Sequence, residues 1–143
     1  MSIRIVIVDD HPAVRMGIRR FLKKIPDIEV VGEAGNGTMA LELVDELKPD
    51  MLLLDVELPD IKGFEVAKRL HEKKSQTKIL AISAYSDRQY ILGMLTNGAA
   101  GYLVKDDVPD SIHQAIQSIS RGTWGWLSPI ASQMLHPSGP STV

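Results

Sequence analysis

Residues 50–60 (DMLLLDVELPD) decide the fold that this chain is predicted to adopt. The run 51–54 is apolar throughout, which is typical of a parallel strand covered on both faces. Asp55 follows the run directly. Three other runs have the same form, an apolar strand that leads into polar residues: 3–10 (IRIVIVDD), 78–84 (KILAISA) and 101–105 (GYLVK). The pattern predicts a buried parallel sheet with polar residues at the carboxyl ends of its strands.

Strand and helix patterns alternate five times along the chain. Strands are expected over residues 3–8, 28–34, 51–54, 78–82 and 100–104, and helices over 12–24, 38–47, 63–72, 87–96 and 109–120. Five strand–helix units with short connections indicate an α/β fold with a parallel sheet and helices on both faces.

The last part of the chain has a different character. Residues 122–129 (GTWGWLSP) hold both tryptophans, and residues 136–143 (HPSGPSTV) have the composition of a linker. Only residues 130–135 are apolar there, which is too little for a helix-turn-helix. We therefore predict one domain over 1–122 and an extension or linker over 123–143.

Composition narrows the function classes. The length of 143 residues makes one domain the default, and the net charge of −2 gives no electrostatic footprint for nucleic acid. The absence of cysteine rules out disulfides and thiolate zinc sites. No apolar run approaches the roughly 20 residues of a membrane helix. These features predict a cytoplasmic protein that contacts neither a membrane nor nucleic acid.

The polar residues at the strand ends should converge, because the functional crevice of an open parallel sheet lies outside the carboxyl ends of its strands. They are Asp9, Asp10, Asp55, Ser83 and Lys105. Taken singly, each has an ordinary explanation as a helix cap, a loop residue or a surface lysine. Together, three carboxylates, a hydroxyl and an ammonium suit a divalent cation and the transfer of a phosphoryl group to Asp55.

These residues and their neighbours resemble the receiver domain of bacterial two-component response regulators. The resemblance covers about residues 3–121 and rests on four motifs: Asp9-Asp10, Asp55 followed by Leu58-Pro59 and Gly63, Ser83-Ala84, and Gly101-Tyr102 before Lys105. The segments DDHP, GYLVKD and RGTWGWLSP are similar to those of the NarL/FixJ (LuxR-type) subgroup. The resemblance implies a flavodoxin-like, doubly wound (βα)5 fold with a five-stranded parallel sheet in the order 2-1-3-4-5.

The resemblance also implies roles. Asp55 would accept phosphate from a sensor histidine kinase, and Ser83 and Lys105 would sense the phosphoryl group. Tyr102 would be the switch aromatic, although a half-buried strand tyrosine is the plainer interpretation. Mg²⁺ would be held by Asp9, Asp10, Asp55 and the main-chain carbonyl of Glu57. Such a protein is a phosphorylatable switch rather than an enzyme, and its activated form can pair as a homodimer.

Two residues depart from the family's pattern. Asp106 follows Lys105 where many receivers have proline, so we expect a trans peptide bond or a differently shaped loop. Glu57 is an extra acid beside Asp55, and we hypothesise that it alters attack by water. The DNA-binding output domain of the subgroup is missing from these residues. The chain is thus either part of a transcription regulator or a stand-alone receiver in a phosphorelay.

Three other classes of protein fit the sequence less well. A magnesium-dependent phosphatase of the haloacid-dehalogenase type also uses an aspartate nucleophile, but its Asp-x-Asp motif near the N-terminus is missing here. A flavin carrier of the same topology would need a phosphate-binding loop after the first strand, where Asp9 and Asp10 would repel a phosphate. A degenerate receiver that works without phosphate would not need the complete set of acids.

Overall fold

The structure of the protein, a computed structural model, describes residues 2–136. Strand β3 (Met51–Asp55) is buried at every residue and lies in the centre of the sheet. Its side chains alternate between two cores: Leu52 and Leu54 belong to one, and Met51 and Leu53 to the other. This alternation explains why residues 51–54 include no polar side chain, since a strand with two buried faces has no side that water reaches.

The sheet is parallel throughout. Strands β1 (Ile3–Val8) and β4 (Lys78–Ser83) flank β3, and β2 (Ile28–Ala34) and β5 (Gly101–Val104) follow outward. The predicted order 2-1-3-4-5 is confirmed for these strands.

The expectation of five strands was wrong, because a sixth strand, β6 (Trp126–Leu127), pairs with β5. The backbone N–H groups of Gly125 and Trp126 both donate to the carbonyl oxygen of Ala100, at 2.8 and 3.1 Å. A strand of two residues is too short to show the alternation from which strands are predicted, so β6 could not be predicted from the pattern of residues.

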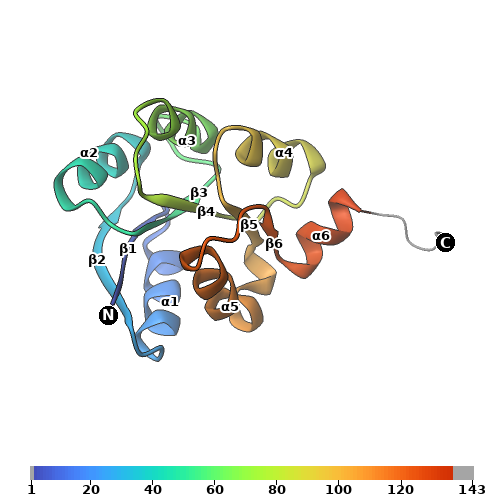
Figure 1. Ribbon diagram of the computed structural model, residues 1–143, viewed down its shortest axis with the longest axis horizontal. Helices are drawn as coiled ribbons and strands as arrows, with labels where there is room; N and C mark the ends of the chain where they lie inside the picture. Colours follow the sequence, from blue (N-terminus) through green and yellow to red (C-terminus); the bar gives the residue numbers. More distant parts are fainter. Residues whose placement is uncertain (1, 137–143) are drawn as a thin grey trace.

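Helices cover both faces of the sheet, as expected for a doubly wound α/β fold (Figure 1). Helices α1 (Pro12–Lys23) and α5 (Val108–Ser120) pack on one face, where they bury residues such as Leu22 and Ile116. Helices α2 (Gly37–Leu47), α3 (Gly63–Glu72) and α4 (Arg88–Thr96) pack on the other. None of the helices within residues 2–136 is both long and apolar enough to cross a membrane.

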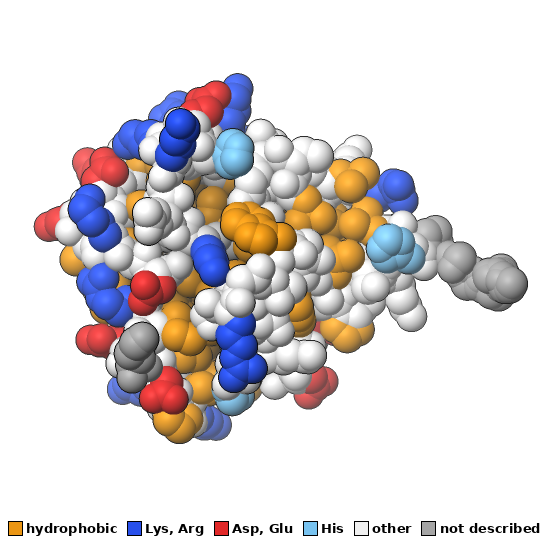
Figure 2. Space-filling model, viewed as in Figure 1, with side chains coloured by type: hydrophobic (Ala, Val, Ile, Leu, Met, Phe, Trp, Pro, Cys, Tyr) orange, Lys and Arg blue, Asp and Glu red, His pale blue; other side chains and the backbone are white. Residues whose placement is uncertain are grey.

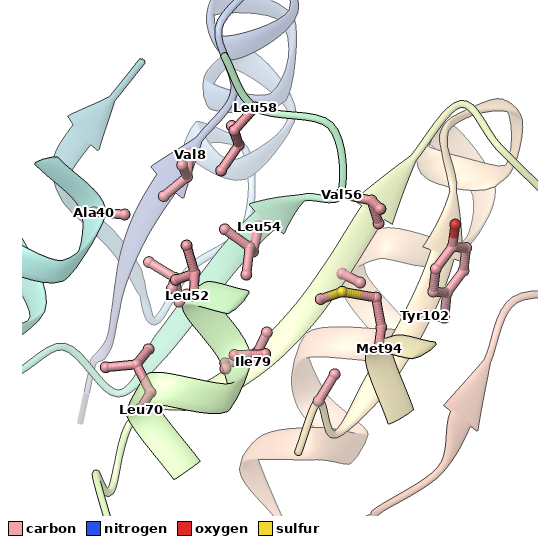
Figure 3. Packing of buried hydrophobic residues seen from close by; sticks show 14 of the residues in the cluster. Val8, Ala40, Leu52, Leu54, Val56, Leu58, Leu70, Ile79, Met94 and Tyr102 are labelled. Atoms are coloured by element: carbon pink, nitrogen blue, oxygen red, sulfur yellow. The ribbon is translucent and has the colours of Figure 1, made fainter. Parts of the chain in front are cut away.

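A further helix, α6 (Pro129–Leu135), lies beside α4 and β5 (Figure 1). Its Ala131 is fully buried in the core cluster that also contains Leu54, Met94 and Tyr102, of which Figure 3 shows a close view. The packed part of the chain thus continues past residue 122. Where a boundary to another domain falls stays a prediction, and the linker-like residues 137–143 lie outside the described part of the chain.

Candidate functional site

The carboxyl ends of β1, β3 and β5 bring three of the predicted residues into contact. Lys105, which follows β5, places its Nζ atom 2.9 Å from Oδ2 of Asp9 and 3.5 Å from Oδ2 of Asp55. Asp9 and Asp55 are 2% and 5% exposed, so both residues are largely shielded from solvent. A single ammonium group is therefore the counter-ion of two buried carboxylates.

Burial and charge move the pKa values of this cluster in different directions. Burial, with a contribution from the charge of Asp9, raises the pKa of Asp55 to about 6, although Lys105 opposes the rise. Burial also acts to raise the pKa of Asp9, but the hydrogen bond from the His11 N–H and the contact with Lys105 outweigh it and lower that pKa. The two carboxylates in turn raise the pKa of Lys105 against the effect of burial.

Asp10 and His11 complete a group of possible metal ligands. One ligand atom from each of Asp9, Asp10, His11 and Asp55 lies within 4.8 Å of the others. The Nδ1 atom of His11 is 3.1 Å from Oδ1 of Asp9 and 3.0 Å from Oδ1 of Asp10. The three carboxylates carry three negative charges against the one positive charge of Lys105, and a divalent cation would balance the difference. His11 was not among the residues predicted to form the site.

A cavity of about 270 Å³ opens beside Asp55. It is lined by residues of all four strand ends: Asp10, His11, Asp55, Glu57, Leu58, Pro59, Ala84, Tyr85 and Lys105. The carboxylate of Glu57 pairs with Nζ of Lys62 at 2.7 Å, and its backbone N–H donates to Oδ1 of Asp55 at 3.3 Å. Asp55 thus faces a small open space bordered by acids, a lysine and an aromatic ring.

Ser83 and Tyr102 are linked through a residue that the sequence analysis missed. The Tyr85 backbone N–H donates to Oγ of Ser83 at 2.9 Å, and the Tyr102 hydroxyl donates to the Tyr85 carbonyl oxygen at 2.7 Å. Tyr102 is fully buried rather than half-buried, and burial raises its pKa to about 12. Both groups of the Tyr85 peptide backbone are therefore occupied by predicted site residues.

Asp60 was also missed, and it fixes the loop that follows Asp55. Its carboxylate accepts hydrogen bonds from the N–H groups of Gly37, Thr38 and Ile61 at 2.7–2.9 Å, and from the Thr38 hydroxyl at 2.6 Å. These bonds hold the pKa of Asp60 well below its usual range. The loop between β3 and α3 is thus clamped to the N-terminus of α2. Asp60 does not end a strand, so only its place in a loop before a helix could have indicated the clamp.

The loop after Lys105 has the trans geometry that was expected for Asp106. No cis peptide bond occurs among residues 2–136, and Lys105–Asp107 form a short 3-10 turn, η1, that leads into α5. Lys105 reaches the two carboxylates from the first residue of this turn.

Residues 5–117 match the family described as the response regulator receiver domain. This chain is a response regulator receiver domain.

Relatives of this receiver domain include curated and solved proteins of the NarL and LuxR type. It is 37% identical over 118 residues to the nitrate/nitrite response regulator protein NarL of Escherichia coli (strain K12), which covers 82% of this chain and 55% of that protein. It is 35% identical over 133 residues to the transcriptional regulatory protein LiaR of Bacillus subtilis (strain 168), covering 93% and 63%. The chain thus spans about half to two thirds of the length of these relatives.

A solved structure is similar over nearly its whole length. The two-component response regulator of the LuxR family from Aurantimonas sp. SI85-9A1 has a TM-score of 0.90 at 32% identity, with 96% of this chain and 98% of that chain covered. This structural similarity supports the α/β architecture of this receiver domain in addition to the sequence match.

Proposed function

We propose that this receiver domain is a phosphorylation switch in which Asp55 accepts a phosphoryl group from a sensor histidine kinase, with Mg²⁺ bound beside it. The observation that carries the proposal is the position of the Asp55 carboxylate, 3.5 Å from Nζ of Lys105 and on the wall of the 270 Å³ cavity. A nucleophile, a cation and space for an incoming group occur together at this edge of the sheet.

The transfer is a substitution at phosphorus. An oxygen of Asp55 forms a bond to phosphorus while the P–N bond of a donor phosphohistidine breaks, and the electron pair leaves with the imidazole nitrogen. The product is an acyl phosphate on Asp55. The carboxylate has to be ionised to attack, and a pKa of about 6 leaves most of Asp55 ionised at neutral pH.

The acidic pocket could hold the metal. Asp9, Asp10 and Asp55, with the Glu57 main-chain carbonyl, would be its ligands, since Mg²⁺ takes few protein oxygens and keeps several waters. Bound there, the ion would neutralise charge on the phosphoryl oxygens. The Asp60 clamp supports this assignment, because it keeps the loop that contains Glu57 in one position relative to α2.

Lys105 and Ser83 would detect the phosphoryl group. A charge of roughly −1.5 to −2 on Asp55 attracts the Lys105 ammonium and the Ser83 hydroxyl. Tyr85 links Ser83 to Tyr102, because its backbone N–H donates to Ser83 and its carbonyl oxygen accepts from the Tyr102 hydroxyl. A movement of Ser83 would therefore change the position of Tyr102, which is the role assigned to the switch aromatic.

The partners follow from the class of relatives. A histidine kinase would supply the phosphoryl group, and phosphorylation would favour a homodimer. The name of LiaR, a transcriptional regulatory protein, supports an output in transcription. DNA would then be bound by a domain outside these residues, in the cytoplasm, and the receiver would act as a switch rather than an enzyme. A stand-alone receiver in a phosphorelay would use the same site.

The experiment that tests the proposal is intact-mass measurement after incubation with acetyl phosphate or phosphoramidate. We expect the mass of one phosphoryl group to be gained with Mg²⁺, little gain without it, and none in Asp55→Asn. Multiple turnover of a small phosphate ester would instead favour the phosphatase class. No gain from either donor, with the protein folded, would contradict the proposal.

Glu57 is expected to shorten the lifetime of the phosphoryl group. Its carboxylate borders the cavity and can accept a proton from an attacking water, so Glu57→Asn should lengthen the half-life by at least about threefold. Lys62→Met is the control, because it removes the ion-pair partner and leaves the carboxylate in place. Loss of the phosphoryl mass over time gives the half-life, and an unchanged rate in Glu57→Asn would remove this role.

A further inference from the structure

His11 directs one ring nitrogen at two acids of the proposed metal site. Its Nδ1 atom lies 3.1 Å from Oδ1 of Asp9 and 3.0 Å from Oδ1 of Asp10. Two ligand atoms that are each about 2.1 Å from one ion lie about 3.0–3.4 Å from each other at octahedral or tetrahedral angles. The nitrogen and the two oxygens therefore have nearly the separations of ligands that share an ion. A hydrogen bond would give similar distances, so the surroundings of the ring matter too.

Asp9 uses its two oxygens for different partners. Oδ2 pairs with Nζ of Lys105 at 2.9 Å, whereas Oδ1 accepts the backbone N–H of His11 at 2.9 Å. Because Asp9 is buried and bonded at both oxygens, its carboxylate is held in one orientation. An ionised carboxylate oxygen has two lone-pair sites. Oδ1 of Asp9 can thus keep its backbone hydrogen bond and still offer a lone pair to an ion.

The backbone of His11 is fixed, while its ring is free to move. Its carbonyl oxygen accepts the N–H groups of Val14 and Arg15 at 3.0 and 3.1 Å, because α1 begins at the next residue. The side chain is 66% exposed and borders the 270 Å³ cavity beside Asp55. An ion can therefore enter from solvent, and the imidazole can turn toward it without disturbing the core.

The other described histidines lie outside this pocket. They are His71 in α3, His113 in α5 and His136 after α6. The histidine side chains visible in Figure 2 lie far apart over different parts of the molecule, and side chains that are far apart in a projection cannot bind one ion together. Among residues 2–136, the group around His11 is the only one in which three or more possible ligand residues meet.

We propose that His11 is a ligand of the proposed metal site and that its imidazole makes the site select Zn²⁺ over Mg²⁺. The inference rests on the proposed function, since it concerns the metal of that site. Mg²⁺ prefers oxygen ligands, whereas imidazole nitrogen suits Zn²⁺. The unprotonated nitrogen of a neutral ring can coordinate the ion directly. His11 should therefore add binding free energy for Zn²⁺ and little for Mg²⁺.

The quantity to measure is the ratio of the two affinities. Isothermal titration of the whole 143-residue chain with ZnCl₂ and with MgCl₂ gives both dissociation constants. His11→Gln keeps a polar side chain of similar length and removes the imidazole. We expect the preference for Zn²⁺ over Mg²⁺ to fall by at least about tenfold, since even groups that only support a metal ligand have effects of that size. General damage to the pocket would weaken both ions and leave the ratio unchanged.

His113→Gln is the matched control, because it makes the same substitution at an exposed histidine of α5. Its ratio should equal that of the unsubstituted chain. Long-range ¹H–¹⁵N spectra of the imidazole rings give a second readout, since coordination changes the nitrogen that binds the ion. Zn²⁺ should shift Nδ1 of His11, and Mg²⁺ should leave it near its metal-free position.

The outcomes separate this inference from the proposed function. An unchanged ratio in His11→Gln, or a Zn²⁺ shift at another histidine alone, would overturn the role of His11. So would a failure of the unsubstituted chain to bind Zn²⁺. If the chain still gains a phosphoryl group with Mg²⁺ in those cases, the phosphorylation switch stands. Zn²⁺ bound through His11 in a folded chain that no donor phosphorylates would contradict the switch and leave the metal ligand in place.

Discussion

Asp55→Asn is expected to stabilise the metal-free protein at neutral pH. The pKa of Asp55 is raised from 3.8 to about 6 in the folded protein, so the folded state binds this proton more tightly than the unfolded chain does. The stability that the protonated group contributes is fully present below about pH 4 and is lost as the pH rises through about 6. At pH 7 the ionised carboxylate therefore costs about 2–3 kcal/mol, which asparagine avoids.

Urea unfolding in EDTA, measured between pH 4 and pH 7.5, gives this difference directly. We expect Asp55→Asn to gain about 2 kcal/mol at pH 7 and almost nothing at pH 4. Asp45→Asn is the control, since Asp45 is an exposed aspartate paired with Lys73, and it should change stability by less than about 0.5 kcal/mol. A gain that is the same at both pH values would show that the buried charge of Asp55 is not its cause.

Gly63→Ala is expected to destabilise the protein and to disturb Asp55. A methyl group on Gly63 would lie 2.7 Å from both the Asp55 carbonyl oxygen and Cα of Val56, and neither backbone atom can rotate away as a side chain would. The Gly63 N–H also donates to the Val56 carbonyl oxygen at 2.8 Å, which brings the start of α3 close to the end of β3. Overpacking of this kind costs about 2–3 kcal/mol.

Gly17→Ala in α1 is the matched control, because a methyl group there would meet nothing within 4 Å. In a helix interior the same change should stabilise by about 0.5–1 kcal/mol. Thermal unfolding measures both variants, and intact mass after acetyl phosphate shows whether Gly63→Ala also slows phosphorylation of Asp55. A Gly63→Ala protein as stable as the unsubstituted one would mean that the backbone at Asp55 has more freedom than these distances allow.

Much of this fold could be predicted because its signals lie in continuous runs. The apolar runs that became β1, β3, β4 and β5 each end at the predicted place within a residue or so. Parallel strands bring their carboxyl ends to one edge, and the contacts of Lys105 with Asp9 and Asp55 are the result. The roles assigned to all of the site residues remain predictions, including those of Asp55 and Lys105.

What the sequence did not reveal depends on single hydrogen bonds rather than on repeated patterns. Tyr85 matters through its backbone N–H and carbonyl groups, which every residue has. Asp60 accepts a hydrogen bond from Gly37 at the start of α2, and these two residues are 23 positions apart in the sequence. The residues of β6 have the sequence character of a linker, because Gly, Ser and Pro surround them and two residues show no alternation.

The shortness of β6 has a consequence for association between copies of this chain. An open sheet tends to add a foreign strand wherever an outer strand leaves its N–H and C=O groups unpaired. Here Gly101 and Tyr102 pair with Trp126 and Leu127, and Ser128 bonds to the Val104 N–H beyond them. Three residues thus keep β5 closed to strand addition, and variants that weaken them should aggregate more readily than variants of equal stability elsewhere.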